Sequence, residues 1–233
     1  MGGCSAGGTS GTKPSDTPPS ILWLNGTYAV LTKINRGDVT IFGGVAHNNI
    51  NKRDIMMALD DSWDVSTKAE LDEMIDSLTV GRHNARFLDE IEEYEISYMS
   101  KSEFDEALGE LDNRLDVMFF QNMFDAYQKF GENAIMGWDL SRAVQLCAYG
   151  YIADFYSYDE ATDKARKVGT VIQKTFDSWD DFFASYLYGY EYWSEDDIED
   201  ANSSYVKRVK ILDELKKDDK SPLHLDWHLD LAK

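Results

Sequence analysis

Apolar residues recur every three or four positions along most of the chain, which is the spacing of one face of an α-helix. The first such run begins at Trp23 and ends near Gly37, and the next covers residues 71–78. Further runs of the same period cover residues 104–119, 140–155, 158–176, 179–193 and 205–215. The pattern predicts a succession of helices.

A capping signal stands before five of these runs: Ser or Thr followed three residues later by Asp or Glu. The pairs are Thr67 with Glu70, Ser100 with Glu103, Ser157 with Glu160, Ser178 with Asp181, and Ser194 with Asp197. The Ser or Thr oxygen can accept a backbone N–H group of the first helical turn. We therefore predict that a helix begins after each of the five Ser or Thr residues.

The fold class follows from the missing helix breakers. No proline stands between Ser20 and Ser221, and proline is the residue that most disrupts a helix interior. One segment, 39–44, has the composition of a short extended arm that ends in two glycines. No repeat of fixed length is present, which disfavours a solenoid. We predict an all-α protein, an irregular orthogonal helical bundle with at most a short β-hairpin near residues 39–44.

Composition excludes several classes of protein. The 233 residues include 43 acidic and 23 basic side chains, for a net charge of −20, which argues against binding to nucleic acid. Two cysteines are too few for a disulfide scaffold or a multi-cysteine zinc site. No apolar run is long enough for a transmembrane helix. We expect neither a cofactor nor a metal.

The N-terminal 20 residues have a different composition from the rest. They contain five Gly, four Ser, three Thr and three Pro, which favours a flexible tether over a packed core. The run Gly2-Gly3-Cys4-Ser5 is similar to the end of a bacterial lipobox, in which the cysteine is lipidated. An ordinary disordered N-terminus fits the same residues.

Two parts of the chain are therefore expected: a tether at residues 1–20 and a single helical domain at residues 21–233. A lipid on Cys4 would place the domain in the cell envelope, outside the cytoplasmic membrane, and would be its only membrane contact. The alternative is a cytoplasmic protein.

The negative charge is concentrated in two stretches. Residues 89–116 carry eleven acidic residues against Lys101 and Arg114, and residues 177–200 carry nine acidic residues and no basic one. Each stretch therefore has a net charge of −9. Both can be solvated helix faces, because acidic residues stabilise helix N-termini. They can also form an acidic docking face for a basic partner.

Several short motifs follow one another in a fixed order. They are Leu22-Trp23 with Asn35, Ser62-Trp63-Asp64-Val65, Gly81-Arg82-His83, Trp138-Asp139-x-x-Arg142, Gly150-Tyr151, Ser178-Trp179, Tyr186-Leu187-x-Gly189 and Trp193. This succession, over roughly residues 21–193, resembles the bacterial domain-of-unknown-function 1266 family. The resemblance implies a helical fold and a bacterial source, and it implies no established activity or catalytic residue.

One group of these residues could form a binding site. Asp139 and Arg142 lie three positions apart, and hence on one face of a helix. We take His83, Trp138 and Trp179, from the other motifs, as further candidates. An arginine beside a carboxylate and an indole can bind a phosphate or carboxylate group. The same Asp–Arg pair can instead be a structural clamp inside a helical core.

Two other features carry weaker signals. His224 and His228 are four residues apart, a spacing at which a helix can present two metal ligands, but the Glu of a metalloprotease motif is missing. Cys147 lies on the apolar face of its predicted helix, so we expect an inert core thiol.

Two hypotheses about function remain open. The first is a non-enzymatic binding or interaction module, tethered to the cell surface, whose partner is an unknown protein or a small anionic ligand. It predicts a solid core with no deep polar pocket, and an acidic or aromatic surface patch as the contact. The alternative is a small-molecule-binding hydrolase in which Asp139, Arg142 and His83 converge in an open cleft.

Overall fold

The computed structural model describes residues 17–232. In this part of the chain there are eleven α-helices, three short 3-10 helices and no β-strand, which confirms the predicted all-α class. The α-helices are α1 (Pro19–Thr27), α2 (Ala29–Ile34), α3 (Asn49–Trp63), α4 (Lys68–Thr79), α5 (Arg82–Glu93), α6 (Lys101–Leu108), α7 (Arg114–Phe130), α8 (Met136–Ile152), α9 (Tyr158–Thr175), α10 (Trp179–Ser194) and α11 (Ser204–Lys217). The 3-10 helices are η2 (Ile96–Tyr98), η3 (Gly131–Asn133) and η4 (Pro222–His224).

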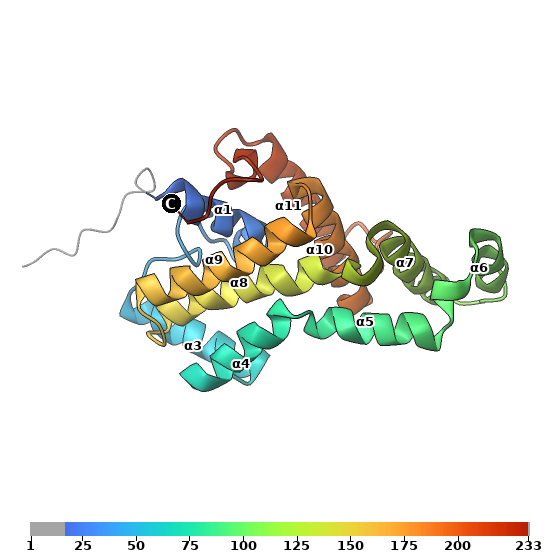
Figure 1. The fold of residues 1–233 in the computed structure, drawn as a ribbon, viewed down its shortest axis with the longest axis horizontal. Coiled ribbons are helices and arrows are strands. Elements are labelled where there is room, and N and C mark those ends of the chain that lie inside the picture. The colour runs from blue at the N-terminus through green and yellow to red at the C-terminus, as the bar shows by residue number, and fades with distance from the viewer. Residues whose placement is uncertain (1–16, 233) are drawn as a thin grey trace, which may run out of the picture.

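The central element is α8, in which 15 of 17 residues are buried. Helices α4, α9 and α10 pack along it (Figure 1), so it is covered on several sides, as a helix with apolar residues around its circumference must be. Gly137 lets α10 approach closely. A Cβ atom at this position would lie 2.5 Å from the carbonyl oxygen of Phe182.

The apolar core has two parts. The larger part surrounds α8, and the smaller part contains Phe87, Phe104, Met123 and Phe124 from α5, α6 and α7, together with Tyr192 from α10. Figure 1 shows α6 and the adjoining ends of α5 and α7 at one end of the molecule, beyond the bundle around α8. Helix α10 contributes to both parts, with Tyr190 in the larger part and Tyr192 in the smaller part.

Four of the five predicted helix starts are confirmed. Thr67 and Ser100 form complete capping boxes, and the side chains of Ser157 and Ser178 accept the backbone N–H of the residue three positions on. The fifth prediction is wrong, because Ser194 is the last residue of α10.

Helix α10 ends there because Glu195 adopts the left-handed conformation, with φ +52°. Helix α11 begins nine residues later than predicted, and Ser203 is its N-cap. Asp197, the acidic residue of the predicted pair, bonds to Arg114. The neighbouring Asp196 accepts hydrogen bonds from the hydroxyl of Tyr190 (3.1 Å) and the backbone N–H of Tyr205 (3.0 Å).

The predicted first helix is two helices, which break at Tyr28. The hydroxyl of Tyr28 donates to Asn25 (2.6 Å) and accepts the backbone N–H of Gly43 (3.0 Å), so this residue joins α1 to the following loop. Residues 39–44 form turns and no hairpin. Gly43 and Gly44, with φ near +80°, turn the chain back so that the backbone N–H of Asp38 donates to the carbonyl oxygen of Gly44 (2.8 Å).

The long run at 104–119 is also divided. Helix α6 ends at Leu108, and α7 begins at Arg114 after an N-cap at Asn113, whose side chain accepts the backbone N–H of Leu115 (3.0 Å). Apolar spacing continues across this gap, so periodicity alone could not reveal it.

Candidate functional site

Three of the predicted site residues meet at one buried carboxylate. Asp139, on α8, is fully buried. Its Oδ1 accepts a hydrogen bond from Nη2 of Arg142 (2.7 Å) and lies 2.7 Å from Nδ1 of His83. Its Oδ2 accepts the backbone N–H groups of His83 (2.8 Å) and Asn84 (3.0 Å). Those groups belong to the first turn of α5, whose N-cap, Gly81, has no side chain to bond them. Asp139 therefore caps α5 from another helix.

Arg142 is also enclosed, with 5% of its surface exposed. Its Nε donates to the carbonyl oxygen of Trp138 (3.1 Å). The guanidinium carbon lies 4.1 Å from the centre of the Trp138 ring and 5.5 Å from that of Trp63, which are cation–π distances. Burial lowers the pKa of Arg142 to about 10, although the Asp139 carboxylate opposes this shift. Its charge is thus held by one carboxylate and two indoles.

The fifth predicted residue, Trp179, lies in another cluster. Its ring centre is 5.0 Å from those of Trp23 and Trp227, and its Nε1 donates to the carbonyl oxygen of Leu225 (3.0 Å). Trp138 is the predicted tryptophan that contacts the Asp–Arg pair. Sequence reasoning grouped the two tryptophans because both belong to family motifs, and the fold separates them.

We call the group of Asp139, Arg142, His83 and Trp138 the clamp. A cavity of about 570 Å³ lies beside it; Asn84 lines this cavity, but none of the clamp residues does. The geometry assigns the clamp to the attachment of α5 to α8. Ligand binding by these residues stays a prediction.

The two weaker signals have different outcomes. Cys147 is fully buried, and burial raises the pKa of its thiol to about 12, which confirms an inert core thiol. His224 belongs to η4, and His228 follows it outside any helix, so the helical spacing that suggested two metal ligands is not formed. Among residues 17–232, no cluster of three or more His, Cys, Asp or Glu could hold a metal ion. In the same range, no helix combines the length and apolar character that a membrane span requires.

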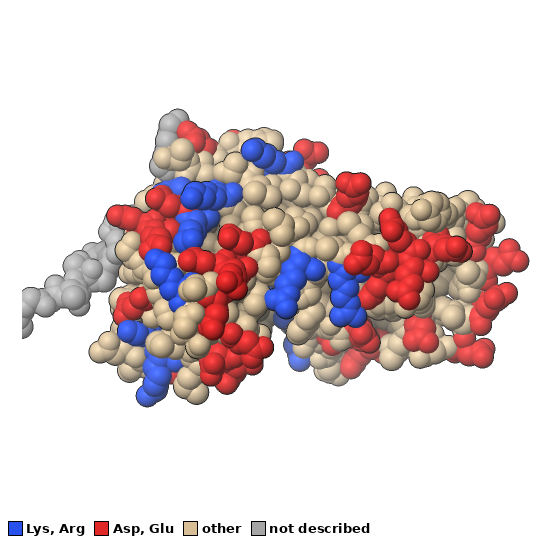
Figure 2. All heavy atoms as spheres, turned by 60° about the horizontal axis from the view of Figure 1, so that its bottom comes forward, with Lys and Arg blue, Asp and Glu red and all other residues tan. Residues whose placement is uncertain are grey.

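The structure reveals a cleft that sequence reasoning did not locate. It has a volume of about 530 Å³ and lies between α5, the start of α7 and the end of α10. Residues of both acidic stretches line this cleft. Figure 2 shows acidic side chains gathered over the end of the molecule that contains α6 and the adjoining ends of α5 and α7. We call it the acidic cleft; it is lined by Arg86, Glu90, Tyr94, Asn113, Leu115, Asp116, Met118, Phe119, Phe120, Glu191, Glu195 and Asp196.

Five carboxyl groups line the acidic cleft against one guanidinium. That guanidinium belongs to Arg86, whose Nε donates to the carboxylate of Glu90 (3.0 Å), and it is 77% exposed. Next to the cleft, Arg114 bonds to Asp197 and Glu199. Both arginines are therefore already paired, so the field inside the cleft is negative.

Glu191 is the unusual member of this set. It is 7% exposed, and its carboxyl group makes no hydrogen bond or ion pair with any residue that the structure describes. Burial, together with the nearby Asp125 carboxylate, raises the pKa of Glu191 to about 7. The carboxyl oxygens face the cleft, and a largely buried carboxyl group with no opposite charge beside it is costly to ionise; groups of this kind cluster at functional sites. In the sequence, Glu191 is marked only as the one acidic residue of the aromatic-rich run 182–193.

One wall of the cleft is aromatic. The Tyr94 and Phe120 rings meet edge to face with centres 5.0 Å apart, and Phe119 stacks on Tyr192 at 5.7 Å. The wall thus offers ring surface next to the carboxyl groups, the combination that attracts organic cations.

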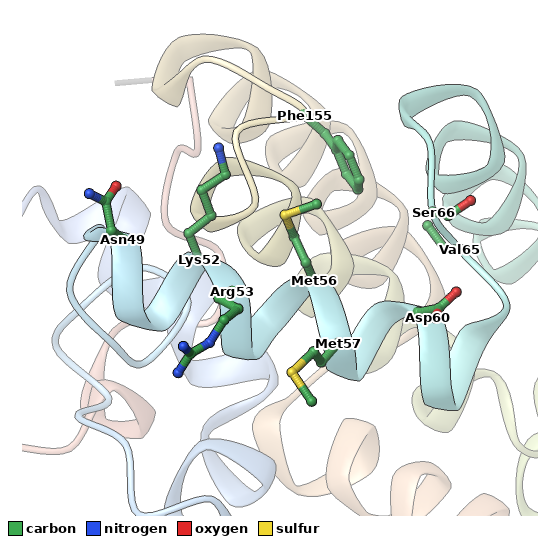
Figure 3. Close-up of a pocket in the computed structure, with 9 residues that line it drawn as sticks. All are labelled: Asn49, Lys52, Arg53, Met56, Met57, Asp60, Val65, Ser66 and Phe155. Atoms are coloured by element: carbon green, nitrogen blue, oxygen red, sulfur yellow. The ribbon is translucent and has the colours of Figure 1, made fainter.

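A third hollow, of about 560 Å³, lies along α3 (Figure 3). Lys52, Met56 and Phe155 lie on one side of this helix, whereas Arg53 and Met57 extend to the other. The Lys52 ammonium is bound to the carboxylate of Asp154 (2.8 Å). Val65 is the one lining residue that is buried, so this hollow is a surface groove with no deep polar group.

The fold and these sites define an all-helical protein with an internal ion-pair clamp and an acidic cleft. The family described as "Protein of unknown function (DUF1266)" matches residues 58–227, more than half of the chain, and the chain belongs to this family. The match confirms the family resemblance and spans both the clamp and the acidic cleft. No curated protein and no solved structure matches the chain.

Proposed function

We propose that the protein is a binding module that takes a basic segment of a protein partner into the acidic cleft. One observation carries this proposal: two acidic stretches far apart in the sequence converge on one cleft. Glu90 and Asp116 come from the first stretch, and Glu191, Glu195 and Asp196 come from the second.

The chemistry of the cleft favours a cation. Its carboxyl groups would attract a basic segment and speed its association, and the aromatic wall would supply apolar contact area. The same charges would repel an anion, so the proposal names a basic partner in place of a small anionic ligand. It makes no use of Arg142, whose guanidinium is enclosed by the clamp.

The proposed module is held at the cell surface by the N-terminal tether. A module held by a lipid on Cys4 would meet partners near the outer face of a membrane, and its net charge of −20 would keep it off anionic lipids. Cys4 lies outside the described residues.

The test is a titration with a fluorescent peptide in which four lysines alternate with serines. Fluorescence anisotropy measures the binding. We expect saturable binding that weakens about tenfold between about 0.05 and 0.5 M salt. The double substitution Asp116→Asn with Glu195→Gln should weaken binding about fivefold or more, because it removes two of the five carboxylates.

A matched control removes the same charge elsewhere. Asp61→Asn with Asp163→Asn alters α3 and α9, at the other end of the molecule (Figure 1). This pair should change the affinity by less than about twofold, since charges beyond a Debye length of about 10 Å are screened. Equal loss in both pairs, or no binding by the unsubstituted protein, would show the proposal to be wrong.

A further inference from the structure

We infer that Glu191 anchors the ligand of the acidic cleft and that it binds a primary alkylammonium group, the head of a lysine side chain. The inference rests on the function proposed above and deepens it, because it names the residue and the chemical group that meet.

Glu191 lacks a partner among the described residues. It lies in the last turns of α10 with 7% of its surface exposed, and it lines a cleft of about 530 Å³. Asp196, which is half-buried, is already bonded to Tyr190 and Tyr205. Glu90 is bonded to Arg86. Glu191 is therefore the buried lining carboxyl group whose acceptor oxygens have no donor among the described residues.

The groups that face Glu191 supply no positive charge. Asp125 on α7 is bonded to the side-chain amide of Gln121 (2.8 Å). Tyr188 on α10 and Tyr205 on α11 interact electrostatically with Glu191 as phenols. A cation that enters the cleft would be the first opposite charge near this carboxyl group, and it would satisfy a group that burial now penalises.

The shape of the cation distinguishes lysine from arginine. An ammonium group is a compact charge with three donors on a flexible apolar stem, whereas a guanidinium is a rigid planar fork. A stem of four carbons can lie along apolar surface while its head reaches a deep acceptor. Met118, Phe119 and Phe120 supply such a surface beside the carboxyl groups. These features favour lysine over arginine.

Binding of an ammonium group beside Glu191 should release protons. Near pH 7 about half of the Glu191 carboxyl groups are protonated, because burial and Asp125 raise its pKa to about 7. An ammonium bound beside it lowers that pKa, so binding at pH 7 should release up to about half a proton. Glu90, Asp116 and Glu195 also line the cleft, and their substitution is the control for such release.

The experiment is isothermal titration with the lysine–serine peptide at pH 7, in phosphate and in Tris, buffers with different ionisation enthalpies. We expect the binding enthalpy of the unsubstituted protein to differ between the buffers by the heat of the released protons. Glu191→Gln should abolish that difference and weaken binding about tenfold or more. Glu195→Gln, just beyond the last residue of α10, should retain the difference and weaken binding less than about threefold.

The ligand provides a second measurement that does not depend on any protein variant. Replacement of one lysine at a time by norleucine, which keeps the stem and removes the charge, should abolish proton release at a single position of the peptide. A peptide with arginine at that position should bind more weakly than the lysine peptide.

The outcomes separate this inference from the function proposed above. If Glu191→Gln binds as tightly as Glu195→Gln and still releases protons, Glu191 is not the anchor, although the acidic cleft still binds the peptide. If the arginine peptide binds as tightly as the lysine peptide, the assignment to an alkylammonium group is wrong. If the unsubstituted protein binds no peptide, both the inference and the proposed function are wrong.

Discussion

The clamp can be tested by removing its carboxylate with Asp139→Ala. This substitution leaves the Arg142 charge buried without its partner and leaves two backbone N–H groups of α5, those of His83 and Asn84, without an acceptor. Loss of one partner of a buried ion pair costs about 3–5 kcal/mol. For a chain of this size each 1 kcal/mol lowers Tm by about 2–4 °C, so we expect Tm to fall by about 6–20 °C.

Two further variants separate the contributions within the clamp. Asp139→Asn keeps an oxygen that can cap α5 and removes the charge, so it should be less destabilising than Asp139→Ala. In the double variant Asp139→Ala with Arg142→Leu no charge is buried. The double variant should therefore lose less stability than the sum of the two single variants, by about 0.5–3 kcal/mol.

The assay is thermal unfolding followed by circular dichroism, with denaturant titration to obtain the free energy of unfolding. Asp163→Ala is the control, because the Asp163–Arg166 pair is exposed and its atoms are 3.4 Å apart; its Tm should change by less than about 2 °C. If Asp139→Ala behaved like this control, or if the clamp variants were additive, the reasoning about the clamp would be refuted.

Two other predictions concern Glu191 and Gly137. The pKa of Glu191 is raised from 4.5 to about 7, so the stability that its protonated form contributes is complete below about pH 4.5 and is lost as the pH rises through 7. Urea unfolding should thus show Glu191→Gln to be more stable than the unsubstituted protein by about 1–3 kcal/mol at pH 8, with little difference at pH 4. Glu195→Gln should show no such trend. A stability difference between Glu191→Gln and the unsubstituted protein that stays constant with pH would contradict the raised pKa of Glu191. Gly137→Ala should lower the free energy of unfolding by about 1–3 kcal/mol or more, because the new Cβ would overlap the α10 backbone. Gly109→Ala, at an exposed helix end, should leave Tm nearly unchanged. A similar small effect at both positions would refute the close contact of α8 and α10.

The sequence was informative where the determining interactions are local. Apolar spacing repeats within each helix, and a capping residue bonds to a residue three positions away, so Thr67 and Ser100 could be identified as helix starts without any knowledge of the fold. The burial of Cys147 followed from the same periodicity. The family motifs also identified His83, Asp139 and Arg142 as a group before any contact between them was known.

Errors arose where a local signal competes with a distant partner. The capping pair at Ser194 has the right spacing, but Glu195 turns the chain and Asp196 bonds to Tyr205. At the break between α1 and α2, the Tyr28 hydroxyl accepts the backbone N–H of Gly43, 15 residues away. The spacing of residues along one helix carries no information about such partners.

The class of fold, the starts of four of the eleven α-helices of residues 17–232 and the uneven charge could be read from the order of residues, because periodicity and capping act over one or two turns. The roles of individual polar residues could not. Asp139 caps a helix that begins 57 residues earlier in the chain, and Glu191 lacks a partner because of how α7, α10 and α11 pack around it. Burial and pairing depend on which distant segments exclude water from a side chain, and packing in three dimensions determines those segments.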